Sequence, residues 1–374
     1  MINIFCDVID NFGDAGVCLR LGRDLCNKKE QVNLFCNDLE TIKKIIKKDD
    51  TKNQSLNISL WPKKGDNVEL KHTVIQAFSV RLPDYIYSNI KKNKALVINL
   101  EYLTAEPFAD DCHKLPSYSD GIESYFFFPG FTSSTGGLVI ENTFLQKIKE
   151  KSEFLNNKSK YKNNIKDSYV TLFSYENSKI PHLLKNLTNL AKNQNSSLTV
   201  IVFEGKPLNN INNLLNLNLS VGDTYRLNNL IIKVSPMVDQ DEYDSLLIGS
   251  YINLVRGEDS IVRAMLTGNP FLWHIYPQEE NAHIEKINAL FDRMDEFCTD
   301  KKSVEILRQL TLSYNGASDY IVDFDISSFI EKWKHLSEEW RDHLLSLGSL
   351  TDNLLAFIRE KNGSERKIVG SIRS

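Results

Sequence analysis

The chain has 374 residues, of which 41% are hydrophobic and 25% charged, with a formal net charge of -4. This length predicts two domains with ample core, and the mild acidity gives no basis for binding nucleic acid or an anionic membrane surface. No apolar run approaches the roughly 20 residues of a membrane span. Residues 1–3 lead into a strand pattern without the basic segment of a signal peptide, so we expect a cytoplasmic protein.

The first two dozen residues predict a strand, a glycine loop and a helix. Ile4, Phe5, Val8 and Ile9 are apolar and mostly branched or aromatic, a break covers 10–16, and a helical pattern starts at Val17. This is the pattern of the first unit of a doubly wound sheet, in which ligands bind at the carboxyl end of the strand.

The end of this first strand and the loop after it are acidic, with Asp7, Asp10 and Asp14. Carboxylates at a helix N-terminus are often plain caps. A loop that cradles phosphate would be neutral or basic, so the alternative is a site for a cation or a proton. Both interpretations remain open at this point.

The rest of the first half alternates strands and helices, which predicts a parallel sheet with right-handed crossovers. The lysine- and asparagine-rich segment 52–71 is expected to be solvated surface. We expect strands at 32–36, 73–78 and 95–100 and helices at 39–48 and 84–92. Four of the six cysteines fall in the first βαβ segment, where they are expected to be small, reduced core residues.

Residues 104–137 are predicted to form one long loop. Its segment 125–131 holds five aromatic residues, and 132–137 reads TSSTGG. The segment is either an aromatic plug in the core or a pocket wall with a mobile, hydroxyl-rich rim. Because long loops in compact domains are usually functional, the pocket wall is favoured.

The second half repeats the alternation. A polar run at 156–166 is the expected linker between a first domain, 1–155, and a second, 167–351, with a C-terminal helix at about 352–374 that packs back on the first domain. We expect strands at 168–175, 198–203, 230–234, 252–255 and 271–275, helices at 181–192, 241–248 and 261–266, and mostly helix over 279–361.

Residues 256–260, RGEDS, follow a predicted strand and open a helix. The free N–H groups of that helix, the Arg256 fork and the Ser260 hydroxyl match a diphosphate. Glu258 would repel phosphate but could accept hydrogen bonds from sugar hydroxyls. The alternative is a helix cap with an Arg256–Glu258 salt bridge.

Other strand ends carry aromatic and polar residues. Phe173 and Tyr175 could stack on a base or lie in the core, and His274, Tyr276 and Gln278 leave the strand that follows the RGEDS helix. The DxD triplets at 239–241 and 323–325 are discounted as metal sites, because such triplets arise easily by chance in a chain with 49 acidic residues. His72, His113 and His283 have no partner at metal-ligand spacing.

Several of these segments resemble the EarP family, the protein-arginine rhamnosyltransferases that modify translation elongation factor P in certain bacteria. The resemblance runs from residue 2 to about residue 300 and covers both halves. It is carried by IFCDVIDNFGDAGV, NLEYLTAE, FFFPGFTSSTGGL, LFSYE and INLVRGEDSIVRAMLTGNPFLWHIYPQEENAH.

The resemblance implies an α/β protein of the GT-B glycosyltransferase fold, with two Rossmann-like domains facing each other across a cleft. It implies inverting transfer of L-rhamnose from dTDP-β-L-rhamnose to an arginine guanidinium of elongation factor P, without metal or cofactor. That modification would activate the factor for rescue of ribosomes stalled at polyproline. No nucleic acid or membrane partner is implied.

The resemblance maps the family's essential carboxylates to Asp10, Asp14 and Glu258. Met237 stands where the family usually has an aromatic residue, so stacking of the base is expected to be weaker or to rest on Phe173 alone. The resemblance implies donor contacts at Phe173, Tyr175, Gln240, Arg256, Asp259, Ser260 and Tyr276, and we add Gly16 to the expected donor contacts.

The residue chemistry agrees with these roles. An arginine is cationic and its lone pair is delocalised, so it needs carboxylates to orient it and to take a proton. We expect Asp14 to be the general base and Asp10 to orient the acceptor. Two alternatives are another GT-B transferase with a different nucleotide sugar and a small acceptor, and a binding protein without catalysis.

Overall fold

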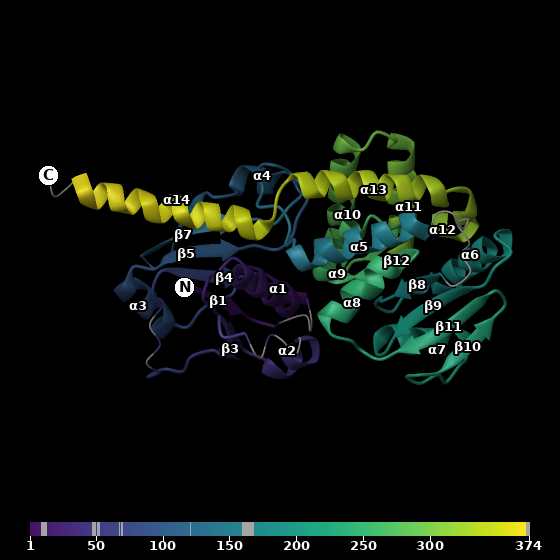
Figure 1. Ribbon diagram of the computed structural model, residues 1–374, viewed down its shortest axis with the longest axis horizontal. Coiled ribbons are helices and arrows are strands. Elements are labelled where there is room, and N and C mark those ends of the chain that lie inside the picture. The colour runs from purple at the N-terminus through teal and green to yellow at the C-terminus, as the bar shows by residue number, and fades with distance from the viewer. Residues whose placement is uncertain are drawn as a thin grey trace. The chain divides into compact units, whose positions relative to one another are not determined.

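The computed structural model describes residues 1–8, 13–46, 50, 53–66, 68, 70–119, 121–158 and 168–371. The chain divides into two compact units, Met1–Glu141 with Leu347–Ser374, and Asn142–Ser346 (Figure 1). This division differs from the predicted boundary at residue 155, because helix α5 (Asn142–Lys158) groups with the second unit. Most of the predicted linker, 159–166, lies outside the described residues.

Within its described residues, the first unit has a seven-stranded sheet in the order β3-β2-β1-β4-β5-β7-β6, parallel except for β6. The strands are β1 (Ile2–Cys6), β2 (Val32–Cys36), β3 (Leu56–Leu60), β4 (Thr73–Ala77), β5 (Leu96–Leu100), β6 (Pro116–Ser119) and β7 (Ile122–Phe127). The predicted strands at 32–36, 73–78 and 95–100 are confirmed. The prediction of plain surface at 52–71 is wrong, because β3 pairs there with β2.

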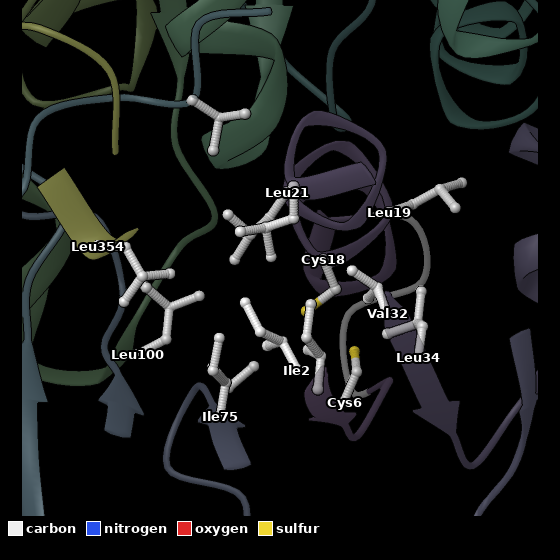
Figure 2. Packing of buried hydrophobic residues seen from close by; sticks show 14 of the residues in the cluster. Ile2, Cys6, Cys18, Leu19, Leu21, Val32, Leu34, Ile75, Leu100 and Leu354 are labelled. Atoms are coloured by element: carbon white, nitrogen blue, oxygen red, sulfur yellow. The ribbon is translucent and has the colours of Figure 1, made fainter. Parts of the chain in front are cut away.

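The helices of this unit are α1 (Gly13–Asn27), α2 (Leu39–Ile45), α3 (Asp84–Asn93), α4 (Phe108–Cys112) and α14 (Leu350–Ser371). Residues of α1, α2 and α14 share one apolar cluster, whereas α3 belongs to the cluster on the other side of the sheet. Figure 2 shows the sulfur atoms of Cys6 and Cys18 inside the first cluster. All six cysteines are free of disulfides.

The segment predicted as one long loop, 104–137, contains α4, β6 and β7, so that prediction is wrong. The ring of Phe127 is fully buried and packs 5.9 Å from the ring of Phe357 in α14. A Cβ atom at Gly136 would lie only 2.6 Å from Phe127, so the chain approaches this ring as only glycine allows. The structure therefore favours the aromatic plug over the mobile pocket wall.

The described part of the second unit has a six-stranded sheet in the order β10-β11-β9-β8-β12-β13. Its strands are β8 (Tyr169–Leu172), β9 (Leu198–Phe203), β10 (Thr224–Leu227), β11 (Leu230–Ser235), β12 (Ile252–Arg256) and β13 (Phe271–His274). The predicted strands are all present, and β10 is an additional antiparallel edge strand.

Besides α5, the helices of the second unit are α6 (Ile180–Asn193), α7 (Lys206–Leu215), α8 (Gln240–Gly249), α9 (Gly257–Thr267), α10 (Ala282–Phe297), α11 (Lys301–Tyr314), α12 (Tyr320–Asp323) and α13 (Ile330–Ser346), with 3-10 turns η2 (Glu279–Asn281) and η3 (Ile326–Ser328). The chain runs outward from β8 to β9 and β11, and from β12 to β13 in the other direction. The strand order therefore reverses between β8 and β12, and in the first unit between β1 and β4. Ligands of such sheets bind at this point of reversal.

Candidate functional site

The acidic loop of the first unit follows β1. Asp10 lies outside the described residues. The side-chain amide of Asn37 donates to the Asp7 carboxylate, and its oxygen accepts from the Val8 N–H at 2.8 Å. The start of this loop is thus tied to the carboxyl end of β2.

Asp14 lies in the first turn of α1, at the carboxyl edge of the sheet, and is only 7% exposed. Several groups raise the pKa of the buried Cys6 thiol, led by its hydrogen bond with Cys18 and including the charge of Asp14. Asp14 is therefore close to the end of β1, at the positive end of the α1 dipole, which favours the carboxylate. Gly16 lies buried in the same turn.

Arg256 ends β12 at the point of reversal in the second unit. Its guanidinium carbon lies 4.3 Å from the centre of the Phe173 ring and 4.7 Å from that of Tyr175. It also donates a hydrogen bond to the Ser174 carbonyl at 3.2 Å. The Arg256 guanidinium at the end of β12 thus contacts the residues that follow β8. These contacts fix the position of its N–H groups.

The rings under this cation are largely in the core. Phe173 is 9% exposed and Tyr175 is 7% exposed, and the edge of Phe173 packs against Phe203 and Tyr243. The structure thus favours the core interpretation for both rings and leaves little of Phe173 for a base. Tyr276 is 51% exposed and packs edge-on to Tyr175, with ring centres 5.4 Å apart.

Helix α9 begins next to these rings. Gly257 has a φ of +71°, and its carbonyl accepts from the indole N–H of Trp273 at 3.1 Å. A Cβ atom there would meet only the Tyr175 hydroxyl, 4.0 Å away, so there is space at the start of the helix. Free N–H groups at such a start bind anions.

The first turn of α9 also carries carboxylates. Glu258 and Asp259 are half-buried, and Ser260 is buried. The side-chain amide of Gln240 donates to Asp259 at 3.5 Å. Polar acceptors and helix N–H donors therefore lie together at one strand end, which suits a ligand that has both hydroxyl and phosphate groups.

The discounted DxD triplets have structural roles. Asp239 caps α8 by accepting from the N–H groups of Asp241 and Glu242, each at 2.9 Å, and Asp325 caps η3 by accepting from Ser327. Among the described residues, no group of three His, Cys, Asp or Glu side chains could hold a metal ion. The backbone N–H of Met237 donates to the Glu204 carboxylate at 2.7 Å. This bond orients the segment in which Met237 stands in place of the family's usual aromatic residue.

Lys206 follows the carboxyl end of β9 and was not among the residues predicted for the site. Its ammonium nitrogen lies 5.4 Å from the centre of the Tyr175 ring. The pattern Gly-Lys directly after a strand was the signal that could have identified it.

In the described chain, no helix is long and apolar enough to cross a bilayer.

His274, at the end of β13, gives a pH prediction. Burial, with the charges of Arg256 and His283, lowers its pKa to about 4, below the usual value of about 6.5. Between these values the unfolded chain binds a proton that the folded chain does not, so stability falls as the pH drops from 6.5 towards 4. We expect His274→Gln to reduce the stability loss between pH 7.5 and pH 5 by about 2 kcal/mol in urea unfolding.

The exposed His335, replaced by Gln, is the matched control, because it makes the same substitution at the protein surface. An equal acid sensitivity of wild type and His274→Gln would contradict the assignment.

Comparison with known proteins bears on this site. A family model described as Elongation-Factor P (EF-P) rhamnosyltransferase EarP matches residues 2–359. The chain is 32% identical to a protein-arginine rhamnosyltransferase of Pseudomonas aeruginosa, over 95% of this chain and 98% of that protein. It is 33% identical to a protein-arginine rhamnosyltransferase of Shewanella oneidensis, over 77% of this chain and 79% of that protein.

A solved structure described as the structural basis for EarP-mediated arginine glycosylation of translation elongation factor EF-P has the same fold. Its TM-score is 0.61 at 23% identity, and the match covers 96% of this chain and 98% of that one. The predicted GT-B fold is thereby confirmed.

Proposed function

Because the chain belongs to the EarP family of EF-P rhamnosyltransferases, we propose that it transfers L-rhamnose from dTDP-β-L-rhamnose to one arginine of translation elongation factor P. Protein-arginine rhamnosyl transfer is the activity class of the family. The donor, the acceptor and inversion at the anomeric carbon are our proposal. The modified factor would then act on ribosomes stalled at polyproline, in the cytoplasm.

The observation that carries the donor assignment is the stacked Arg256 beside the open start of α9. Displacement of rhamnose places growing negative charge on the leaving diphosphate. The Arg256 fork, the α9 N–H groups and the Ser260 hydroxyl would stabilise that charge as it forms. We therefore expect activity without a divalent cation.

Glu258 would contribute through the sugar. A carboxylate in the first turn of α9 opposes phosphate, so its productive partner is a hydroxyl group of the donor. Accepting such hydrogen bonds would orient the anomeric carbon towards the acceptor.

The acceptor step needs a base. In one displacement, the bond from the guanidinium nitrogen to the anomeric carbon forms while the bond from that carbon to the phosphate oxygen breaks. The nitrogen loses a proton, which passes to Asp14. Asp10 would hold the guanidinium through paired hydrogen bonds. Attack opposite the leaving group inverts the β-linked sugar to an α-linked product.

Intact-mass spectrometry of elongation factor P tests the function. We expect the factor, incubated with this protein and dTDP-L-rhamnose in EDTA, to gain one deoxyhexose unit on one arginine. The one-bond coupling between the anomeric carbon and its proton in that product would report inversion.

The control uses the same factor with its modified arginine changed to lysine, which should gain no mass. If dTDP-L-rhamnose binds but no mass is gained, the acceptor is another molecule or the protein does not catalyse. Transfer only from a different nucleotide sugar would support the other GT-B transferase.

A further inference from the structure

Lys206 occupies a functional edge of the second unit. It is the first residue of α7, directly after Gly205, whose φ of +89° turns the chain out of β9. β9 pairs with β8, and β8 pairs with β12, in parallel. Lys206, Tyr175 and Arg256 therefore lie at the same edge of the sheet, where the parallel strands β9, β8 and β12 end.

Two cations contact one ring at this edge. The Tyr175 ring centre lies 5.4 Å from the Lys206 ammonium nitrogen and 4.7 Å from the Arg256 guanidinium carbon. The two charges are thus within about one Debye length, roughly 10 Å, and repel one another. The ring quadrupole offsets this repulsion only in part. An anion bound beside both groups would be attracted by both charges.

The Tyr175 hydroxyl points to where that anion would lie. It is the nearest group to a Cβ atom placed at Gly257, the first residue of α9. Lys206 is therefore one tyrosine ring away from the anion-binding start of α9. Its side chain is exposed, so the ammonium group can turn towards a ligand.

The charge of the donor calls for a second cation. Each phosphate of a nucleoside diphosphate sugar carries a negative charge, and the first turn of α9 adds the carboxylates of Glu258 and Asp259. Arg256 alone does not balance these groups.

We propose that Lys206 is a second cation of the donor site, which binds the diphosphate of the nucleotide sugar. This assignment rests on the nucleotide-sugar donor proposed above. It makes Lys206 a binding residue for the donor, with no part in proton transfer.

Calorimetry with dTDP and ligand-observed NMR with thymidine test this assignment. We expect Lys206→Gln to weaken dTDP binding about tenfold, the loss of one charge-assisted contact, and to leave thymidine binding unchanged. Lys206→Arg should restore most of the dTDP affinity. In turnover, the KM for the donor should rise by a similar factor while kcat changes little.

Lys233→Gln is the matched control, since it removes the same charge from an exposed position on the neighbouring strand β11. Suppose that the wild type binds dTDP. If Lys206→Gln then binds dTDP equally well, or if Lys233→Gln weakens binding as much as Lys206→Gln does, the role of Lys206 is overturned while the proposed donor stands. An equal loss of thymidine affinity would also overturn that role. A wild-type protein that binds no dTDP would overturn the proposed donor itself.

Discussion

Replacing Asp14 with Asn is expected to lower kcat for arginine rhamnosylation by about 10²–10⁴-fold, the usual contribution of a general base. The amide has the same size as the carboxylate and keeps its place in the first turn of α1, but it cannot accept the proton of the guanidinium. Single-turnover kinetics with saturating donor and acceptor would measure this effect on the chemical step.

The dTDP affinity of this variant should match that of the wild type, because the groups assigned to the diphosphate belong to the second unit. Asp24→Asn is the matched control: Asp24 is buried on the same helix, and burial is the main cause of its raised pKa. We expect that variant to fold and to remain active. If Asp14→Asn kept kcat within about threefold of wild type, another group would be the base.

The alternation of strands and helices was predictable because it depends on local pattern. Buried parallel strands such as β4 and β9 are short apolar runs between turn residues, and that pattern needs no knowledge of distant contacts. β3 was missed because only one of its five residues is buried and it lies within a lysine- and asparagine-rich segment. Its pairing with β2 is a tertiary effect.

The aromatic segment shows the limit of local reasoning most clearly. A run such as Phe126-Phe127-Phe128 gives no sign of whether its rings line a pocket or fill a core. The partner that decides this, Phe357, lies more than two hundred residues later in α14. The division at Glu141 had the same cause, because the contacts that place α5 with the second unit, such as Lys147 with Asp241 at 2.8 Å, are distant in sequence.

The candidate site was predictable in composition and less so in geometry. Strand-end residues were expected to gather at one edge, and Arg256, Tyr175 and Tyr276 do so. The use of Tyr175 as a platform for two cations was not predictable, because it depends on the order of strands β9, β8 and β12 in the sheet. That order is also what brings Lys206 into the site.

Replacing Arg256 with Gln is expected to lower kcat/KM for the donor by about 10²–10³-fold, comparable to the loss of one donor that stabilises transition-state charge. The substitution removes the fork that lies over Phe173 and the hydrogen bond to the Ser174 carbonyl. Steady-state kinetics with varied dTDP-L-rhamnose, together with dTDP calorimetry, would separate the effect on binding from the effect on the chemical step.

Arg256→Lys separates charge from shape. A lysine keeps the positive charge but cannot form two parallel hydrogen bonds or stack as a plane, so we expect it to recover binding more than kcat. Arg226→Gln on the exposed edge strand β10 controls for the loss of one positive charge from the second unit. Full activity of Arg256→Gln would mean that the leaving diphosphate is stabilised by the α9 N-terminus without the stacked guanidinium. An equal loss in Arg256→Lys and Arg256→Gln would instead assign the effect to the planar fork, since charge alone would then contribute nothing.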